Sequence, residues 1–129
     1  MSFSRDIRKQ DCDLELRIYD CLPGRLPALL NRFAEHTLAI WDKHGIRQAG
    51  FFTTIVGESS HRLTYLIAWE SLADREVKWK AFTTDPAWLK ARDESERDGQ
   101  ILSNISNQLL SPTANGRPRK PPTLPERPE

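Results

Sequence analysis

Hydrophobic and polar residues alternate over residues 13–19, which is the period of a β-strand. One face of this strand is apolar and carries Leu14, Leu16 and Ile18. The opposite face is mainly polar and carries Glu15, Arg17 and Tyr19. We expect the apolar face to pack against a helix and the polar face to need a second cover.

A helix is predicted after this strand, because apolar residues then recur at the helical spacing of about 100° per residue. Pro27 suits the first helical turn, and Gly45 is placed to end the helix in the left-handed conformation. One stripe along the helix carries Leu26, Leu29, Leu30, Phe33, Ile40 and Trp41. The charged residues Arg25, Arg32, Glu35 and Asp42 lie away from its centre. This pattern predicts a helix that covers a sheet.

The rest of the chain predicts a matching second half. Residues 50–56 and 62–69 are rich in β-branched and aromatic residues and are separated by a turn, which favours a hairpin. Ser71 is a helix cap for a segment ending near Phe82, and Asp85-Pro86 begins another that runs to about residue 98. Residues 101–110 form a last strand. The order β-α-β-β-α-β predicts an α+β, ferredoxin-like fold, with a four-stranded antiparallel sheet and helices on one face.

Composition limits the domain organisation and the kinds of partner. The chain of 129 residues suits one domain, over 12–111, preceded by a flexible arm at 1–11. Residues 112–129 hold six of the nine prolines and are predicted to be a disordered tail. A net charge of +1 gives no footprint for nucleic acid, and no segment has the length and apolarity of a membrane span.

Cysteine usage indicates the compartment. Cys12 and Cys21 would bracket the first strand, so they lie too far apart to form a disulfide with each other. Two free thiols are typical of a reducing environment. We therefore expect a cytoplasmic protein.

Several short motifs, occurring in order, resemble the NIPSNAP family. They are 15–19 (ELRIY), 23–25 (PGR), 40–46 (IWDKHGI), 50–54 (GFFTT), 69–72 (WESL) and 75–76 (RE). The similarity spans about residues 12–111. It implies a dimeric α+β barrel, in which two ferredoxin-like subunits face their sheets together, and an uncharacterised molecular function. Other families on this fold include cofactor-free monooxygenases, haem-degrading enzymes and muconolactone isomerases.

The predicted architecture favours a dimer independently of the resemblance. A four-stranded sheet with helices on one side leaves its other side bare. A second copy of the chain is the simplest cover for that side. The primary functional hypothesis is therefore a homodimeric interaction domain or small-molecule-binding domain.

One group of residues predicts a ligand pocket between the first helix and the sheet. Tyr19, Trp41, His44, Tyr65 and Trp69 would line it, with Arg17 as a possible holder of an anion. Such a lining suits a small hydrophobic or aromatic ligand. The alternative function is a small cofactor-independent enzyme, similar to a monooxygenase or an isomerase, in which His44 or Tyr19 would transfer protons in this pocket. The alternative is that Trp41 and Trp69 belong to the core, and that His44 stabilises the helix C-terminus.

Other chemistry has weaker support in the sequence. Glu15 and Arg17 could pair across the dimer interface or bind a polar ligand. Structural pairing is favoured because buried charges need partners. The histidines lack the spacing of a metal site, and no cofactor motif occurs. We expect no metal and no cofactor. Haem binding is a further alternative, for which His36 or His44 would supply the ligand.

Overall fold

The computed structural model describes residues 12–116, so the predicted arm at 1–11 and residues 117–129 of the predicted tail lie outside it. The first half of the domain contains β1 (Asp13–Cys21), α2 (Leu26–Arg32), the π-helical segment η1 (Phe33–Thr37), α3 (Leu38–His44) and β2 (Arg47–Thr53). The second half contains β3 (Arg62–Trp69), α4 (Leu72–Thr83), α5 (Pro86–Ser95) and β4 (Leu102–Leu110).

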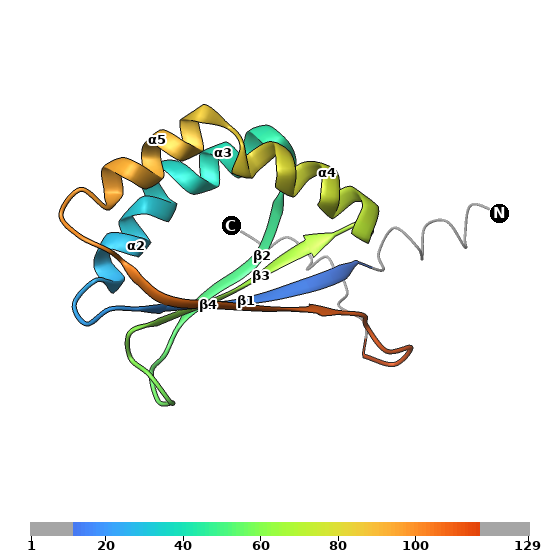
Figure 1. Cartoon of the computed structure of the whole chain (residues 1–129). Coiled ribbons are helices and arrows are strands. Elements are labelled where there is room, and N and C mark those ends of the chain that lie inside the picture. Colours follow the sequence, from blue (N-terminus) through green and yellow to red (C-terminus); the bar gives the residue numbers. More distant parts are fainter. Residues whose placement is uncertain (1–11, 117–129) are drawn as a thin grey trace, which may run out of the picture.

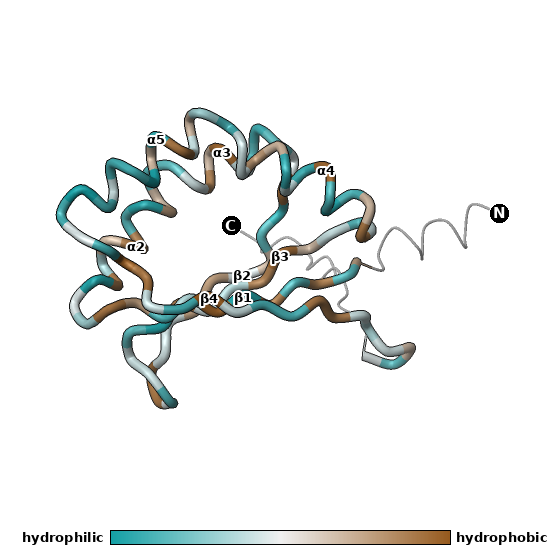
Figure 2. Tube along the Cα trace, in the orientation of Figure 1, coloured by the Kyte–Doolittle hydropathy of each residue, from teal (hydrophilic) through white to brown (hydrophobic). Residues whose placement is uncertain are grey.

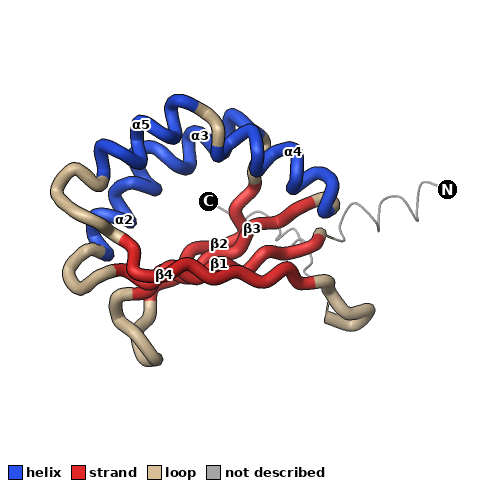
Figure 3. The backbone as a smooth tube through the Cα atoms, in the orientation of Figure 1, coloured by secondary structure: helices blue, strands red, loops and turns tan. Residues whose placement is uncertain are grey.

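The four strands form one antiparallel sheet in the order β2-β3-β1-β4. The helices form a layer over one face of this sheet and leave the other face without a helix (Figure 1; Figure 3). This arrangement confirms the predicted α+β, ferredoxin-like fold. β1 and β3 are the central strands, whereas β2 and β4 lie at the edges.

Most helix boundaries follow the predicted caps. Gly45 ends α3 with φ 74°, a conformation that glycine adopts without a steric penalty. The Ser71 hydroxyl accepts a hydrogen bond from the Asp74 backbone N–H at the start of α4. Asp85 caps α5, and Pro86 occupies its first position. The boundaries of two elements were predicted wrongly: β2 runs over Arg47–Thr53 rather than 50–56, and α5 ends at Ser95 rather than near residue 98.

The core lies between the helix layer and the sheet. Alternate residues of β3 point into it and are at most 1% exposed: Leu63, Tyr65, Ile67 and Trp69. Phe33 and Trp41 meet them from the helix layer, and both rings lie within 6 Å of the Tyr65 ring, at 5.3 and 5.6 Å. Aromatic rings therefore join the two layers.

The predicted orientation of β1 was wrong. Glu15, Arg17 and Tyr19 face the helices and are 0–8% exposed. Leu14, Leu16 and Ile18 lie on the opposite face, where they are only partly buried. Alternation shows that a strand has two unlike faces, but it does not show which one the helices cover. Partners from β3, β4 and α4 satisfy the charges of the polar face, as described below, and this makes its burial possible.

The first helical region also departs from a regular α-helix. The η1 segment inserts a π-type turn, and the Thr37 hydroxyl donates to the Arg32 carbonyl five residues earlier. The predicted positions of two side chains were consequently wrong. Leu30 is 39% exposed, whereas Arg32 is 3% exposed and lies with its guanidinium 5.2 Å from the Trp88 ring centroid. The extra residue in the turn rotates the helix relative to the predicted stripe.

Candidate functional site

The Glu15 carboxylate is the centre of a buried polar cluster on the helix-covered face of the sheet. It accepts hydrogen bonds from Arg17, Trp69, Arg75 and Asn107, at distances of 2.7 to 3.2 Å. These donors come from β1, β3, α4 and β4 respectively. The carboxylate thus ties a helix to three strands of the sheet.

Each nitrogen of the Arg17 guanidinium has a partner in the same cluster. Its Nε donates to the Tyr65 hydroxyl at 2.8 Å, and one terminal nitrogen donates to the Tyr19 hydroxyl at 3.3 Å. The other terminal nitrogen pairs with Glu15 at 2.7 Å. Its guanidinium carbon lies 4.6 Å from the Trp79 ring centroid, within the range of a cation–π contact.

The ionisation of the cluster follows from these contacts. Burial raises the pKa of Glu15, but hydrogen bonds from Arg75, Asn107, Arg17 and Trp69 outweigh this effect and lower the pKa to about 2. Burial lowers the pKa of Arg17, but its interactions with Tyr65, Tyr19 and Glu15 raise it above the usual value. Burial raises the pKa of Tyr65. Glu15 and Arg17 are therefore both charged near neutral pH.

The structure brings together four of the six predicted site residues. Arg17, Tyr19 and Tyr65 are linked by hydrogen bonds, and Trp69 joins them through Glu15. These polar groups bind one another inside a single chain. A buried hydrogen-bonded network of this kind holds a fold in one arrangement, and its polar groups are engaged with one another.

Sequence reasoning missed Arg75, Trp79 and Asn107 as members of the cluster. Arg75 and Asn107 lie 60 and 92 residues from Glu15 along the chain. The one available signal was the pair of charges at Glu15 and Arg17, which required partners if buried. Nothing in the local pattern of α4 or β4 identified those partners.

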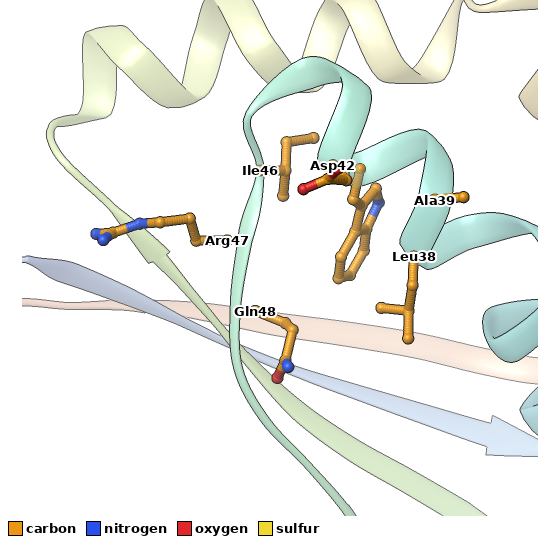
Figure 4. A pocket seen from close by; sticks show the side chains of 7 residues that line it. Leu38, Ala39, Asp42, Ile46, Arg47 and Gln48 are labelled. Atoms are coloured by element: carbon orange, nitrogen blue, oxygen red, sulfur yellow. The ribbon is translucent and has the colours of Figure 1, made fainter.

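Trp41 packs beside this cluster, in the core. It is 1% exposed, and its indole N–H has no acceptor among the described residues. Trp41 also contributes to the lining of an open groove of about 580 Å³ between α3 and the start of β2 (Figure 4). The other lining residues are Leu38, Ala39, Asp42, Ile46, Arg47 and Gln48. In Figure 4 the Arg47 side chain points away from α3.

His44 lies in a separate ionic contact between two helices. Its Nε2 is 2.7 Å from the Asp85 carboxylate, and Lys43 Nζ is 2.6 Å from the same oxygen. The other Asp85 oxygen accepts from the Ala87 backbone N–H at the start of α5. Hydrogen bonds from Lys43, His44 and Ala87 lower the pKa of Asp85 well below its usual value. This contact joins the C-terminus of α3 to the N-terminus of α5.

The remaining candidate groups are dispersed. His36 is exposed on η1. Within residues 12–116, no three His, Cys, Asp or Glu side chains lie close enough together to hold a metal ion. No helix in this part of the chain has both the length and the apolarity needed to span a membrane.

Comparison with known proteins establishes the family. The NIPSNAP family model matches residues 14–116, which is most of the chain. The chain belongs to the NIPSNAP family. This confirms the resemblance carried by the sequence motifs. None of the curated proteins compared with the chain is significantly similar to it.

Solved structures of NIPSNAP proteins share the fold. An uncharacterised NIPSNAP-like domain protein from Burkholderia xenovorans has a TM-score of 0.74 at 24% identity, covering 92% of this chain and 99% of that chain. A NIPSNAP family protein of unknown function from Agrobacterium tumefaciens has a TM-score of 0.71 at 24% identity, covering 84% of this chain and 91% of that chain. At these identities the likeness shows the fold alone.

Proposed function

We propose that this NIPSNAP protein is a homodimeric binding domain, in which the helix-free sheet faces of two copies pack together. The apolar character of that face supports the proposal. Strand pairing places Leu16 opposite Leu66 of β3, and Ile18 opposite Thr64, so these side chains share one face. The apolar residues of this face are Leu14, Leu16, Ile18, Phe52, Leu66, Ala68 and Leu110.

A second copy that covers this face removes its apolar side chains from water. Such an apolar centre with polar margins is the usual anatomy of a protein interface. The charged pair at one margin, Asp20 and Arg62, is joined within the chain at 2.7 Å. This pair therefore brings no unpaired charge to that margin when two identical faces meet about a two-fold axis.

A single substitution at the centre of the face tests the proposal. Leu16→Asp places a charge between the two sheets, so we expect a monomer with an unchanged far-UV circular dichroism spectrum. Leu72→Asp is the matched control, because Leu72 is 53% exposed at the start of α4. We expect it to remain dimeric. A Leu16→Asp protein that keeps the mass of a dimer contradicts the proposal.

The contacts of the Glu15 cluster favour binding over catalysis. Tyr19 accepts from Arg17, and His44 is paired with Asp85, so the two predicted proton-transfer groups are engaged in separate structural contacts. We propose that Arg17, Tyr65 and Trp69 act with Glu15 to hold the helix layer on the sheet. This leaves the groove beside Trp41 as the better place for a small molecule.

The groove supports small-molecule binding as a second function. Its volume of about 580 Å³ lies in the range of ligand pockets, and Leu38, Ile46 and Trp41 give it an apolar lining. A small hydrophobic or aromatic molecule suits such a lining. We expect 2-naphthol to shift the Trp41 indole N–H resonance in the wild type and in Ala34→Trp, a control on exposed η1. Ala39→Trp fills the groove and abolishes the shift. An unshifted wild-type resonance contradicts binding in this groove.

The two cysteines support a reducing compartment such as the cytoplasm. Both Cys12 and Cys21 are free thiols in the structure. We expect Ellman's reagent to titrate both thiols in unfolded protein isolated from its native compartment. Recovery of a disulfide-linked form instead would contradict this location.

A further inference from the structure

The loop between β2 and β3 carries two adjacent apolar side chains in water. Ile55 is 96% exposed and Val56 is 93% exposed. Phe52, near the end of β2, is 54% exposed. Single exposed apolar residues are common, but adjacent β-branched side chains with almost no protein contact form a small patch. We call residues 55–56 the hairpin tip.

The base of this loop is braced, so the tip is held away from the domain. Arg62 Nε donates to Asp20 at 2.7 Å, and another Arg62 nitrogen lies 2.8 Å from Glu58. The Ser59 hydroxyl accepts from the His61 backbone N–H at 3.1 Å. These bonds brace the β3 side of the loop, next to the tip. A fixed apolar tip loses little conformational entropy on binding.

The tip extends on the side of the sheet that has no helices. Figures 1 and 2 show the β2–β3 loop projecting below the sheet, opposite to the helix layer, with apolar colour near its end. Phe52 pairs with Thr64 and so lies on the same face as Leu16. The apolar surface of that face thus continues through Phe52 towards the tip.

We propose that the hairpin tip of each chain packs against a second copy of this chain and clamps the margin of the sheet-to-sheet interface. This inference rests on the proposed dimer. Two-fold symmetry makes the contact reciprocal, so each dimer contains two such clamps. Together they remove four apolar side chains, Ile55 and Val56 of each copy, from water.

The charges around the tip favour a protein partner over a lipid surface. Peripheral lipid binding generally combines apolar side chains with unpaired Lys or Arg nearby. Here Glu58 is the charged residue next to the tip, and Arg62 is already paired with Glu58 and Asp20. An apolar tip without a free cation beside it among residues 12–116 suits the apolar surface of a second copy.

Sedimentation velocity over a range of concentrations tests the clamp. The variant is Ile55→Ser with Val56→Ser, and the matched control is Val77→Ser, because Val77 is 72% exposed on α4. We expect the tip variant to raise the dimer dissociation constant at least tenfold, since four buried apolar side chains are lost per dimer. We expect the control to leave it unchanged.

The outcomes separate this inference from the proposed dimer. A wild-type dimer whose dissociation constant is the same in the tip variant overturns the clamp and leaves the dimer intact. A monomeric wild type overturns both. A monomeric wild type that floats with phosphatidylcholine vesicles, and loses this binding in the tip variant, assigns the tip to lipid and also overturns the clamp. A photo-crosslinker at position 56 gives a covalent dimer only if the tip contacts the second copy.

Discussion

Glu15 of β1 and Arg75 of α4 are joined by two hydrogen bonds, of 2.8 and 3.2 Å. Glu15 is fully buried, and the Arg75 side chain is only 18% exposed. The helix layer is thus fastened to the sheet by an ion pair that water screens poorly. Arg17, Trp69 and Asn107 complete the shell around the same carboxylate.

Removing the Arg75 charge should destabilise the domain. Arg75→Met keeps much of the side-chain volume but takes two hydrogen bonds from a buried carboxylate. We expect a loss of about 2–3 kcal/mol in the free energy of unfolding, measured in urea, because Glu15 keeps its other donors. Arg92→Met is the control, since Arg92 is 47% exposed and should change the free energy by less than about 0.5 kcal/mol. Equal effects of the two substitutions would count against the buried pair.

The free energy of unfolding should depend on pH through the ionisation of Glu15. Its pKa is lowered to about 2 in the folded chain, from an ordinary value of 4.5. Unfolded chains therefore bind the proton first as pH falls, and the stabilisation present above pH 4.5 is lost between there and about pH 2. This difference between the two pKa values corresponds to about 3 kcal/mol in the free energy of unfolding.

Glu15→Gln isolates this effect. At pH 7 the variant should be less stable than the wild type, because the paired carboxylate is gone. The two free energies of unfolding should converge as the pH is lowered below 4.5, the ordinary pKa of the carboxyl group. Parallel pH profiles for the two proteins would show that Glu15 does not titrate as its contacts require.

Local signals predicted much of the fold. The bounds of β3, the Gly45 terminus and the Ser71 and Asp85 caps all follow from residues close together in the sequence. The order of elements followed from these signals. The start of β2 was missed, because Arg47 and Gln48 are polar residues of an irregular edge strand.

Which face of β1 is buried depends on residues distant in the sequence, so the local pattern could not predict it. Glu15 and Arg17 form the polar face of an alternating strand, and such a face usually meets water. Its burial becomes favourable only with Arg75 and Asn107 in place, and the chain reaches these residues six and eight elements later. The candidate site was predicted in part for the same reason: Arg17 and Tyr65 meet directly, but Trp69 joins them through the Glu15 carboxylate, which the predicted pocket lining did not include.

Asp85 should act both as a helix cap and as an ionic partner. Asp85→Asn keeps an acceptor for the Ala87 N–H but loses the charge that faces Lys43 and His44. Asp85→Ala loses both. We therefore expect thermal unfolding temperatures in the order wild type, Asp85→Asn, Asp85→Ala, from highest to lowest. An Asn variant no more stable than the Ala variant would mean that the cap contributes nothing.

A side chain added at Gly45 should lower the stability of the fold. Its φ of 74° disfavours other residues, and a Cβ there would lie 3.4 Å from Lys78 Cε. We expect Gly45→Ala to lower the free energy of unfolding by about 1–2 kcal/mol. Gly45→Asn should lose less, because asparagine tolerates the left-handed conformation better. Urea unfolding of the three proteins measures this order, and a Gly45→Ala variant as stable as the wild type would contradict it.

The mass of the wild-type protein in solution tests the central claim, that a second copy covers the helix-free sheet face. Sedimentation equilibrium at micromolar concentrations should give twice the 14.9 kDa mass of one chain. A single species of 14.9 kDa at these concentrations would contradict the claim, because Leu16 and its apolar neighbours would then face water.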